Sequence, residues 1–316
     1  MTLPVTTVDC SKQAETPAAD ELAQCVSGET LIRRSEPLAK RTTLRVGGPA
    51  DLYVEPASEA DLAAVLRFCK RRGEPFFVLG RGSNLLVKDG GFRGVVICLA
   101  HSHFSRIELA GERLCCGAGA KLKAVAVEAK RNGLAALEFL EGIPGSVGGA
   151  LRMNAGAMGG SMFQVVESVR LMDFEGEAKE KPARELSATY RSCPMVKAHV
   201  ALAAVLHGQP GQREAIERRM SEYSRKRWQS QPAAPSAGCM FRNPASIPAG
   251  KLIEELGLKG TRVGGAVISA EHGNFIVNDA GASAHDILAL IEVVRQHARR
   301  ERGIELEPEV EIIGEE

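Results

Sequence analysis

The glycines are the residues of this chain whose spacing most directly suggests chemistry. Of the 316 residues, 33 are glycine, and many of these fall in clusters. One cluster, "LGRGSNLL" at residues 79–86, follows the apolar run "PFFVLG" at residues 75–80. Successive backbone N–H groups in such a turn form an anion-binding nest, and glycine lets a pyrophosphate approach the backbone. Taken alone, the segment is equally consistent with an ordinary turn.

This first loop matches neither of two common phosphate-binding sequences. No Gly-Lys-Ser/Thr follows it, which excludes a Walker A loop. Leu85 stands where the third glycine of a Rossmann fingerprint belongs. A second cluster, "EGIPGSVGGALRMNAGAMGG", covers residues 141–160 and suits a large planar ligand with a diphosphate, although a bundle of tight turns is the alternative. Together the two loops predict a dinucleotide that is not held by a Rossmann fold.

The elements that would position these loops are short strands with a few helices between them. Ser58 and Asp61 form a capping box for a helix that Gly73 ends. Apolar or alternating runs and helical spacing predict five strands and one further helix: strands 75–80, 94–99, 113–120, 165–173 and 198–206, and helix 121–132. Short strands with interspersed helices favour an α+β fold over a regularly wound α/β sheet.

A change of composition at residues 208–212, "GQPGQ", predicts a domain boundary. Beyond it we expect a basic helix over residues 213–227 and a loop rich in proline and alanine over residues 231–238. A capped helix with an apolar stripe covers residues 283–303, and an alternating strand covers residues 304–314. About 100 residues is a sensible size for such a second domain.

Composition and charge exclude several classes of protein. The chain is 44% hydrophobic and 25% charged, so it is not disordered as a whole. Its net charge of +1 argues against a surface that binds nucleic acid or an acidic membrane. No apolar run is long enough for a transmembrane helix. The eight cysteines form no Cys-x-x-Cys pair, so no metal site is expected and the thiols are free.

Residues 1–31 stand apart from the rest of the chain. They are acidic, lack the basic and apolar regions of a secretory signal, and carry no motif. We expect them to form an extension without ordered structure, and we expect a cytoplasmic protein.

Six segments together identify a resemblance to one family. The chain resembles the MurB family, the UDP-N-acetylenolpyruvoylglucosamine reductases of peptidoglycan synthesis, in its compact type II form. The match runs from about residue 32 to residue 314 and rests on these segments: "RTTLRVGGPADLYVEP" (41–56), "LGRGSNLLV" (79–87), "GIPGSVGGALRMNAGAMGG" (142–160), "TYRSC" (189–193), "SAGCMFRNP" (236–244) and "LEPEVEIIG" (306–314).

The resemblance implies a fold and a reaction. Residues 32–208 would form a PCMH-type (vanillyl-alcohol-oxidase-like) FAD-binding domain of two α+β subdomains, and residues 209–316 a smaller α+β substrate-binding domain whose last strand carries Glu309. The reaction would be NADPH-dependent reduction of UDP-N-acetylglucosamine enolpyruvate to UDP-N-acetylmuramate, a step that serves cell wall biogenesis, cell shape and cell division. The protein would be a monomer with neither nucleic-acid nor membrane partners.

The two glycine loops, with the glycines after residue 116, would hold FAD. Neither loop contains a histidine, so the flavin is expected to be non-covalent. The implied cofactor-binding residues are Gly80, Arg81, Gly82, Ser83, Asn84, Leu85, Gly117, Gly119, Ile143, Pro144, Gly145, Ser146, Gly148, Gly149, Asn154 and Gly156.

The resemblance also implies three catalytic residues. Hydride addition to the enolpyruvyl methylene carbon leaves an enolate, which needs cations or hydrogen-bond donors and an acid. Arg191 and Glu309 match the residues that stabilise this enolate. Glu309 must carry or share a proton to do so. Cys239 stands where the family's commonest form has a serine as proton donor, and a thiol, with a pKa of ~8.5, is the better acid.

Five further residues match substrate-side positions of the family. They are Tyr190, Arg227, which would contact the substrate diphosphate, Asn243, His272 and Asn274. For His272 a purely structural role is an alternative. Two other functions are left open: a PCMH-type flavin oxidoreductase that acts on a small alcohol or sugar, and a non-catalytic UDP-sugar-binding protein.

Overall fold

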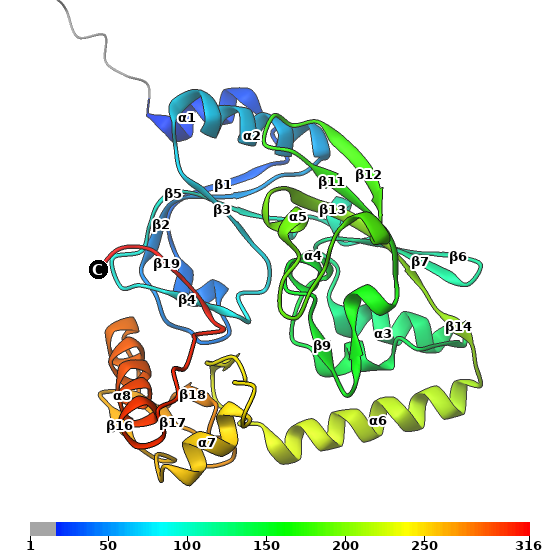
Figure 1. Ribbon diagram of the computed structural model, residues 1–316. Coiled ribbons are helices and arrows are strands. Elements are labelled where there is room, and N and C mark those ends of the chain that lie inside the picture. Colours follow the sequence, from blue (N-terminus) through cyan, green and yellow to red (C-terminus); the bar gives the residue numbers. More distant parts are fainter. Residues whose placement is uncertain (1–16) are drawn as a thin grey trace, which may run out of the picture.

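The α+β architecture predicted from the sequence is confirmed. The computed structural model describes residues 17–316, and helices are interspersed among groups of strands along them (Figure 1). Among these described residues, no helix combines the length and the apolar character that a membrane crossing requires.

The first sheet carries the strand that leads into the first glycine loop. Its strand order is β1-β2-β5-β3, with β1 antiparallel to β2 and the other neighbours parallel. The helix α2 (Glu59–Arg72) begins at the predicted cap, where Ser58 Oγ accepts a hydrogen bond from Asp61 N (3.1 Å), and ends at Gly73 with φ +66°. The strands are β1 (Leu31–Pro37), β2 (Pro49–Glu55), β3 (Phe76–Leu79) and β5 (Phe92–Cys98).

An ordered helix precedes this sheet, contrary to the prediction that residues 1–31 lack structure. The helix α1 (Ala18–Cys25) buries Leu22 completely in the core beside α2. Its acidic residue Glu21 pairs with Arg71 and Arg72 at the basic end of α2. Glu21 therefore forms ion pairs with a neighbouring helix. The part of the prediction that concerns residues 1–16 lies outside the described residues.

The second sheet is antiparallel throughout and has the order β12-β11-β13-β7-β6. Gly117 ends β7 and Gly119 follows it. A Cβ at either would lie about 2 Å from a carbonyl oxygen, of Phe104 and Leu99 respectively, so no larger residue fits. The strands of this sheet are β6 (Ile107–Ala110), β7 (Arg113–Gly117), β11 (Val166–Met172), β12 (Ala178–Pro182) and β13 (Val200–His207). The helices of the unit are α3 (Leu122–Arg131), α4 (Val147–Arg152) and α5 (Pro194–Lys197). Two short strand pairs complete it: β8 (Leu134–Ala135) pairs with β14 (Gln209–Pro210), and β9 (Gly156–Ala157) pairs with β10 (Gly160–Ser161).

The long helix α6 (Arg213–Ser230) connects this unit to the C-terminal one (Figure 1). Its buried residues Ile216 and Met220 belong to the core that the two sheets share. By packing, α6 therefore belongs with the first part of the chain, and the second core starts only after it. The boundary predicted at residue 208 lies one helix too early, because the helix that follows the turn residues packs against the first part of the chain.

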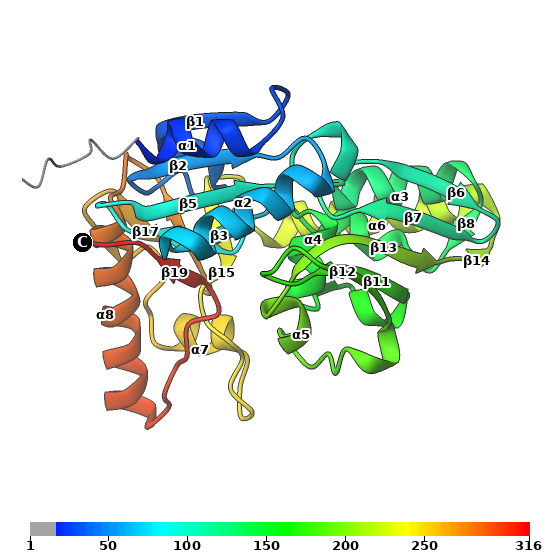
Figure 2. The ribbon, with the colours of Figure 1, turned by 90° about the horizontal axis from the view of Figure 1, so that it is seen from above.

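The C-terminal unit is a small sheet covered by two helices. Its strand order is β15-β18-β17-β16, and α8 begins at the predicted capping box of Ser283 and Asp286 and ends at Gly303 with φ +62°. Figure 2 shows this unit beside the first sheet, on the side away from β6 and β7. The elements are β15 (Ser236–Cys239), β16 (Arg262–Val263), β17 (Ala266–Ile268), β18 (Phe275–Asn278), α7 (Ala249–Glu255) and α8 (Ala284–Arg302).

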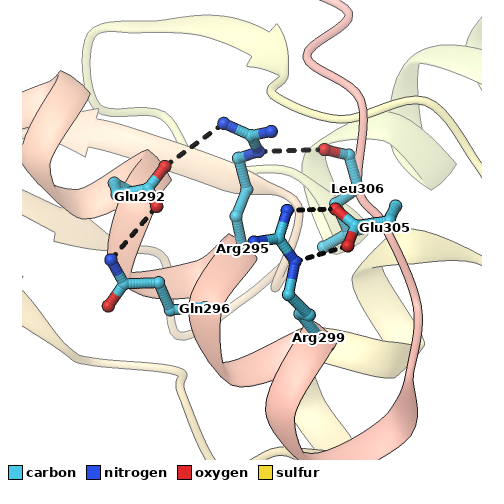
Figure 3. A network of polar contacts seen from close by, with 6 residues as sticks. All are labelled: Glu292, Arg295, Gln296, Arg299, Glu305 and Leu306. Carbon is cyan, nitrogen blue, oxygen red and sulfur yellow. Dashed lines mark hydrogen bonds and ion pairs between the residues drawn. The ribbon is translucent and has the colours of Figure 1, made fainter.

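The chain then returns to the first part of the molecule. The strand β19 (Glu311–Ile313) pairs in parallel with β4 (Leu85–Val87), at the end of the first glycine loop. The predicted strand 304–314 is thus much shorter, and Glu309 precedes it. The stretch after α8 is bound to that helix by side chains, since Arg295 Nε donates to Leu306 O (3.2 Å) and Arg299 Nη2 to Glu305 Oε2 (2.8 Å) (Figure 3).

Candidate functional site

A cavity of about 930 Å³ lies where the first sheet, the second sheet and the second glycine loop meet. This is the upper end of the usual size range for small-molecule and cofactor sites. Its walls include residues of β3 and β5, the segment after β7, the start of α4 and the segment from α5 to β13.

Six of the sixteen predicted cofactor residues line this cavity: Gly80, Arg81, Gly119, Ser146, Gly148 and Gly149. The other ten are not among its lining residues: Gly82, Ser83, Asn84, Leu85, Gly117, Ile143, Pro144, Gly145, Asn154 and Gly156. The two glycine loops nevertheless converge, because a Cβ on Gly80 would lie 3.0 Å from Ser146 Oγ and 3.9 Å from Gly149 Cα. A side chain at Gly80 would narrow the cavity at this point.

The lining is strongly positive. Four lining cations, Lys40, Arg81, Lys121 and Lys197, form no ion pair within residues 17–316, and Glu74 is the one lining carboxylate. A cavity with unpaired cations and glycine-lined walls suits a ligand that has both a planar part and a diphosphate. The residues present therefore fit a flavin dinucleotide.

One wall of the cavity was missed by reasoning from the sequence. The Arg41 guanidinium lies over the Tyr53 ring, 4.4 Å from its centroid, and Tyr53 OH donates to Glu55 Oε1 (2.7 Å). Burial raises the pKa of Tyr53 well above its usual range, which keeps the phenol neutral. Both Arg41 and Tyr53 line the cavity. They stand inside the segment 41–56, but their spacing carries no signal of a shared wall.

Arg191 and Glu309, predicted as catalytic residues, lie side by side. Arg191 Nε is 2.9 Å from Glu309 Oε1, and their side chains are 25% and 9% exposed. Nε is nevertheless a buried donor without a hydrogen bond of good geometry among the described residues. The site thus holds a cationic donor that is available to an anion.

A tight turn presents Arg191. Thr189 and Ser192 bond through their backbones in both directions, and Arg191 adopts φ +55°, a strained conformation for a residue with a side chain. Tyr190 in the same turn is 63% exposed, and the Arg191 guanidinium lies 5.4 Å from its ring centroid. Strain of this kind persists where the surrounding contacts impose it.

Cys239 completes the group at the end of β15. Burial and, to a smaller extent, the charge on Glu309 raise the pKa of the Cys239 thiol to about 11, while Arg191 opposes the shift. Burial likewise raises the pKa of Glu309, against the opposing effect of Arg191. Glu309 N donates to Met240 O (2.7 Å), which fixes Glu309 beside the residue that follows Cys239. The three predicted catalytic residues are therefore brought together.

Two residues predicted to contact the cofactor hold these catalytic segments. Asn84 Nδ2 donates to the carbonyl oxygen of Glu309 (3.1 Å). Asn154, with φ +40°, donates from Nδ2 to the carbonyl oxygen of Thr189 (3.0 Å) at the base of the Arg191 turn. The glycine loops thus position the catalytic residues as well as line the cavity.

The remaining predicted substrate residues make contacts within the protein. Arg227 Nη1 donates to the carbonyl oxygen of Gly142, and burial lowers the pKa of Arg227. Asn243 Oδ1 accepts from Ala249 N (3.0 Å), at the start of α7.

His272 and Asn274 are bonded to the protein in the same way. His272 Nδ1 accepts from Asn274 N (3.1 Å). Asn274 is 2% exposed and bonds both ways with the Phe241 backbone, so it secures the chain after Cys239. Within residues 17–316 no cluster of histidine, cysteine or acidic residues could hold a metal ion.

Two family models match the chain. The model of the UDP-N-acetylenolpyruvoylglucosamine reductase C-terminal domain matches residues 231–313, and the model of an FAD binding domain matches residues 50–180. The first of these begins directly after α6, where the second core also begins. The cofactor of the chain is therefore FAD.

Known reductases are similar over nearly the whole chain. The UDP-N-acetylenolpyruvoylglucosamine reductase of Heliobacterium modesticaldum is 47% identical over 285 residues, which cover 89% of this chain and 90% of the relative. The enzyme of the same name from Clostridium novyi is 43% identical, with 87% and 90% coverage.

A solved structure agrees with these relatives. The crystal structure of UDP-N-acetylenolpyruvylglucosamine reductase (MurB) from Thermus caldophilus matches with a TM-score of 0.78 and 40% identity, over 90% of this chain and 98% of that one. This likeness confirms the resemblance drawn from the six sequence segments and the predicted flavoprotein fold. The chain belongs to the UDP-N-acetylenolpyruvoylglucosamine reductase family, and it is an FAD-dependent oxidoreductase.

Proposed function

We propose that this protein reduces UDP-N-acetylglucosamine enolpyruvate to UDP-N-acetylmuramate through bound FAD, with NADPH as the hydride donor, in peptidoglycan precursor synthesis. The observation that carries the proposal is the grouping of Arg191, Glu309 and Cys239 at the junction of the two glycine loops with the C-terminal unit. This grouping joins a cation, a buried carboxyl and a neutral thiol, which the reaction requires together.

FAD is proposed to occupy the 930 Å³ cavity, where Gly80, Ser146, Gly149, Arg81 and the unpaired lysines would hold it. Bound FAD would supply the redox chemistry that connects NADPH to the enolpyruvyl methylene carbon, which takes up the hydride. Glycine at positions 80 and 149 would leave room for the close approach of this large ligand.

Arg191 is proposed to stabilise the enolate that hydride addition leaves on the substrate. Its charge is permanent, and its buried Nε lies beside Glu309 without a hydrogen bond among the described residues. The strained turn fixes the guanidinium before the substrate arrives, so little reorganisation is needed as charge develops.

Glu309 and Cys239 are proposed to handle the protons. The raised pKa of Glu309 favours its protonated form, which can donate a hydrogen bond to the enolate oxygen. The Cys239 thiol stays neutral at physiological pH, since its pKa is about 11, and it can transfer its proton to the carbon next to the carboxylate. The thiolate that remains is stabilised by Arg191 and recovers its proton from solvent.

The wider assignments belong to the same proposal. They are a cytoplasmic monomer, a diphosphate contact at Arg227, further substrate contacts at Tyr190, Asn243 and His272, and a role in cell shape and division. Family membership supports them.

Steady-state NADPH oxidation tests the proposed function. The purified protein should be yellow from bound flavin, and it should oxidise NADPH rapidly only when UDP-N-acetylglucosamine enolpyruvate is present. A colourless protein that binds the UDP-sugar would indicate a binding protein. A yellow protein that oxidises NADPH only with a small alcohol or sugar would indicate another oxidoreductase.

A further inference from the structure

We propose that Arg152 and Glu311 form a positioning pair that holds the Arg191 segment and the Glu309 segment at their working separation. The proposal rests on the proposed function and extends it, because it names residues outside the catalytic group on which the substrate-reducing step depends. Neither residue is predicted from the sequence to act in catalysis.

The side chain of Arg152 reaches the segment that carries Glu309. Arg152 is the last residue of α4, in the second glycine loop, and its Nη2 donates to Glu311 Oε1 (2.7 Å). Glu311 follows Glu309 by two residues. Through this ion pair the second glycine loop is connected to the C-terminal segment.

The backbone of Arg152 reaches the segment that carries Arg191. The carbonyl oxygen of Arg152 accepts a hydrogen bond from Cys193 N (3.0 Å), and Cys193 follows Arg191 by two residues. The Cys193 side chain is fully buried and donates to Leu186 O (3.4 Å), so this anchor cannot shift easily. One residue therefore contacts both catalytic segments.

The backbone of Glu311 is fixed independently. Glu311 N donates to Asn84 O (3.1 Å), and β19 pairs with β4 from Leu85 onwards. These bonds connect the Glu309 segment to the first glycine loop only. The Arg152–Glu311 pair supplies the connection to the second glycine loop, from which the Arg191 turn is held.

Because the Arg152–Glu311 ion pair is accessible to solvent, its effect on the reaction rate can be measured separately from its effect on stability. The two side chains are 32% and 34% exposed, and ion pairs this accessible contribute little to stability because solvent screens them. A misplacement of about 1 Å at reacting groups can cost roughly 100-fold in rate. Loss of the pair should therefore slow the reaction while the fold keeps its stability.

The test uses Glu311→Gln, Arg152→Gln and the double variant in the flavin-loaded protein. We expect each single variant to slow flavin reoxidation by saturating UDP-N-acetylglucosamine enolpyruvate by about 10- to 100-fold. The substrate concentration at half-saturation should stay near the wild-type value. The double variant should be no slower than the slower single variant, because both substitutions break one contact.

Glu316→Gln is the matched control. Glu316 Oε1 pairs with Lys88 Nζ at the same distance, 2.7 Å, in the same C-terminal segment, but away from the catalytic group. This control should reoxidise at the wild-type rate. Hydrogen exchange of peptides that cover residues 304–314 should be faster in the apoprotein of Glu311→Gln than in that of Glu316→Gln, while both keep the wild-type melting temperature and flavin content.

Several outcomes would overturn the proposal. Reoxidation of Glu311→Gln at the wild-type rate would mean that the pair does not position the catalytic segments. A double variant slowed by the product of the two single-variant factors would mean the same. Loss of flavin from any of the three variants would make the pair a cofactor-retaining contact instead. Failure of the proposed function itself would be distinguishable, because the wild-type protein would then not reoxidise with this substrate at all.

Discussion

Cys239 illustrates how the environment of a residue decides its chemistry. A cysteine in solution is partly ionised near neutral pH, which would make it reactive towards oxidants and alkylating reagents. Burial and the neighbouring Glu309 raise the pKa of Cys239 to about 11. The thiol therefore stays protonated, which is the form that a proton donor must have.

Substitution of Cys239 should separate the two half-reactions. NADPH reduces the flavin without any need for a proton at the substrate carbon, so Cys239→Ala should keep this step near normal. Reoxidation by the enolpyruvyl substrate should slow by the ~10²–10⁴ typical of general acid catalysis. Cys239→Ser should recover much of this loss, because its hydroxyl lies in nearly the same place. Stopped-flow traces check this, and wild-type reoxidation in the alanine variant would make Cys239 a packing residue.

Glu309 should give the substrate half-reaction a pH dependence. Its pKa is raised by burial, and its protonated form is the one that donates to the enolate. The rate should therefore be highest below that pKa and fall as the pH rises through it. The Gln side chain of the Glu309→Gln variant does not titrate, so the variant should reoxidise more slowly and at a rate that does not change over the same pH range. An alkaline fall that persists unchanged in Glu309→Gln would assign the titration to another group.

At the scale of elements, the features that can be predicted from the sequence are those that depend on local contacts. The helices α2 and α8 begin and end at Ser58, Gly73, Ser283 and Gly303 as predicted, because each cap is made within a few residues. The helix α1 was missed because its stability comes from α2, through buried Leu22 and the ion pairs of Glu21. Propensity and composition carry no information about such a distant partner.

Leu22 allows the role of α1 to be measured. Its side chain is fully buried, so Leu22→Ala should lower the free energy of unfolding by about 2–5 kcal/mol through lost contacts and a cavity. Glu29→Ala, at an exposed position in the segment after α1, is the control and should change stability little. Denaturant unfolding provides the measurement. Equal stability of Leu22→Ala and the wild type would show that α1 does not stabilise the fold.

The end of α6 should affect one substrate more than the other. Arg227 is proposed to contact the substrate diphosphate, and loss of a hydrogen bond to a charged group costs about 1.5–3 kcal/mol. Arg227→Ala should therefore raise KM for the UDP substrate by at least tenfold and that for NADPH much less. Arg225→Ala, in the same turn of the helix but exposed, is the matched control. Equal effects on both KM values would point to the Gly142 contact as the cause.

At the scale of the whole molecule, the catalytic group forms where distant parts of the chain meet. Asn84 bonds Glu309 across 225 residues, and Thr43 Oγ1 donates to Ser236 O (2.7 Å) across 193 residues. The family resemblance identified the three catalytic residues, and their proximity follows from the return of β19 to β4. No local pattern predicts that return. The roles of Asn84 and Asn154 could not be predicted either, because their partners are backbone carbonyls that carry no sequence signal.

The central claim is that this grouping of residues lets the enolpyruvyl substrate take a hydride from the reduced flavin. The most direct test reduces the bound flavin with one equivalent of NADPH without oxygen and then mixes it with UDP-N-acetylglucosamine enolpyruvate. We predict that the flavin absorbance returns in a single rapid phase and that UDP-N-acetylmuramate forms in equal amount. Flavin that stays reduced in the presence of this substrate, and is reoxidised only when oxygen is admitted, would contradict the account.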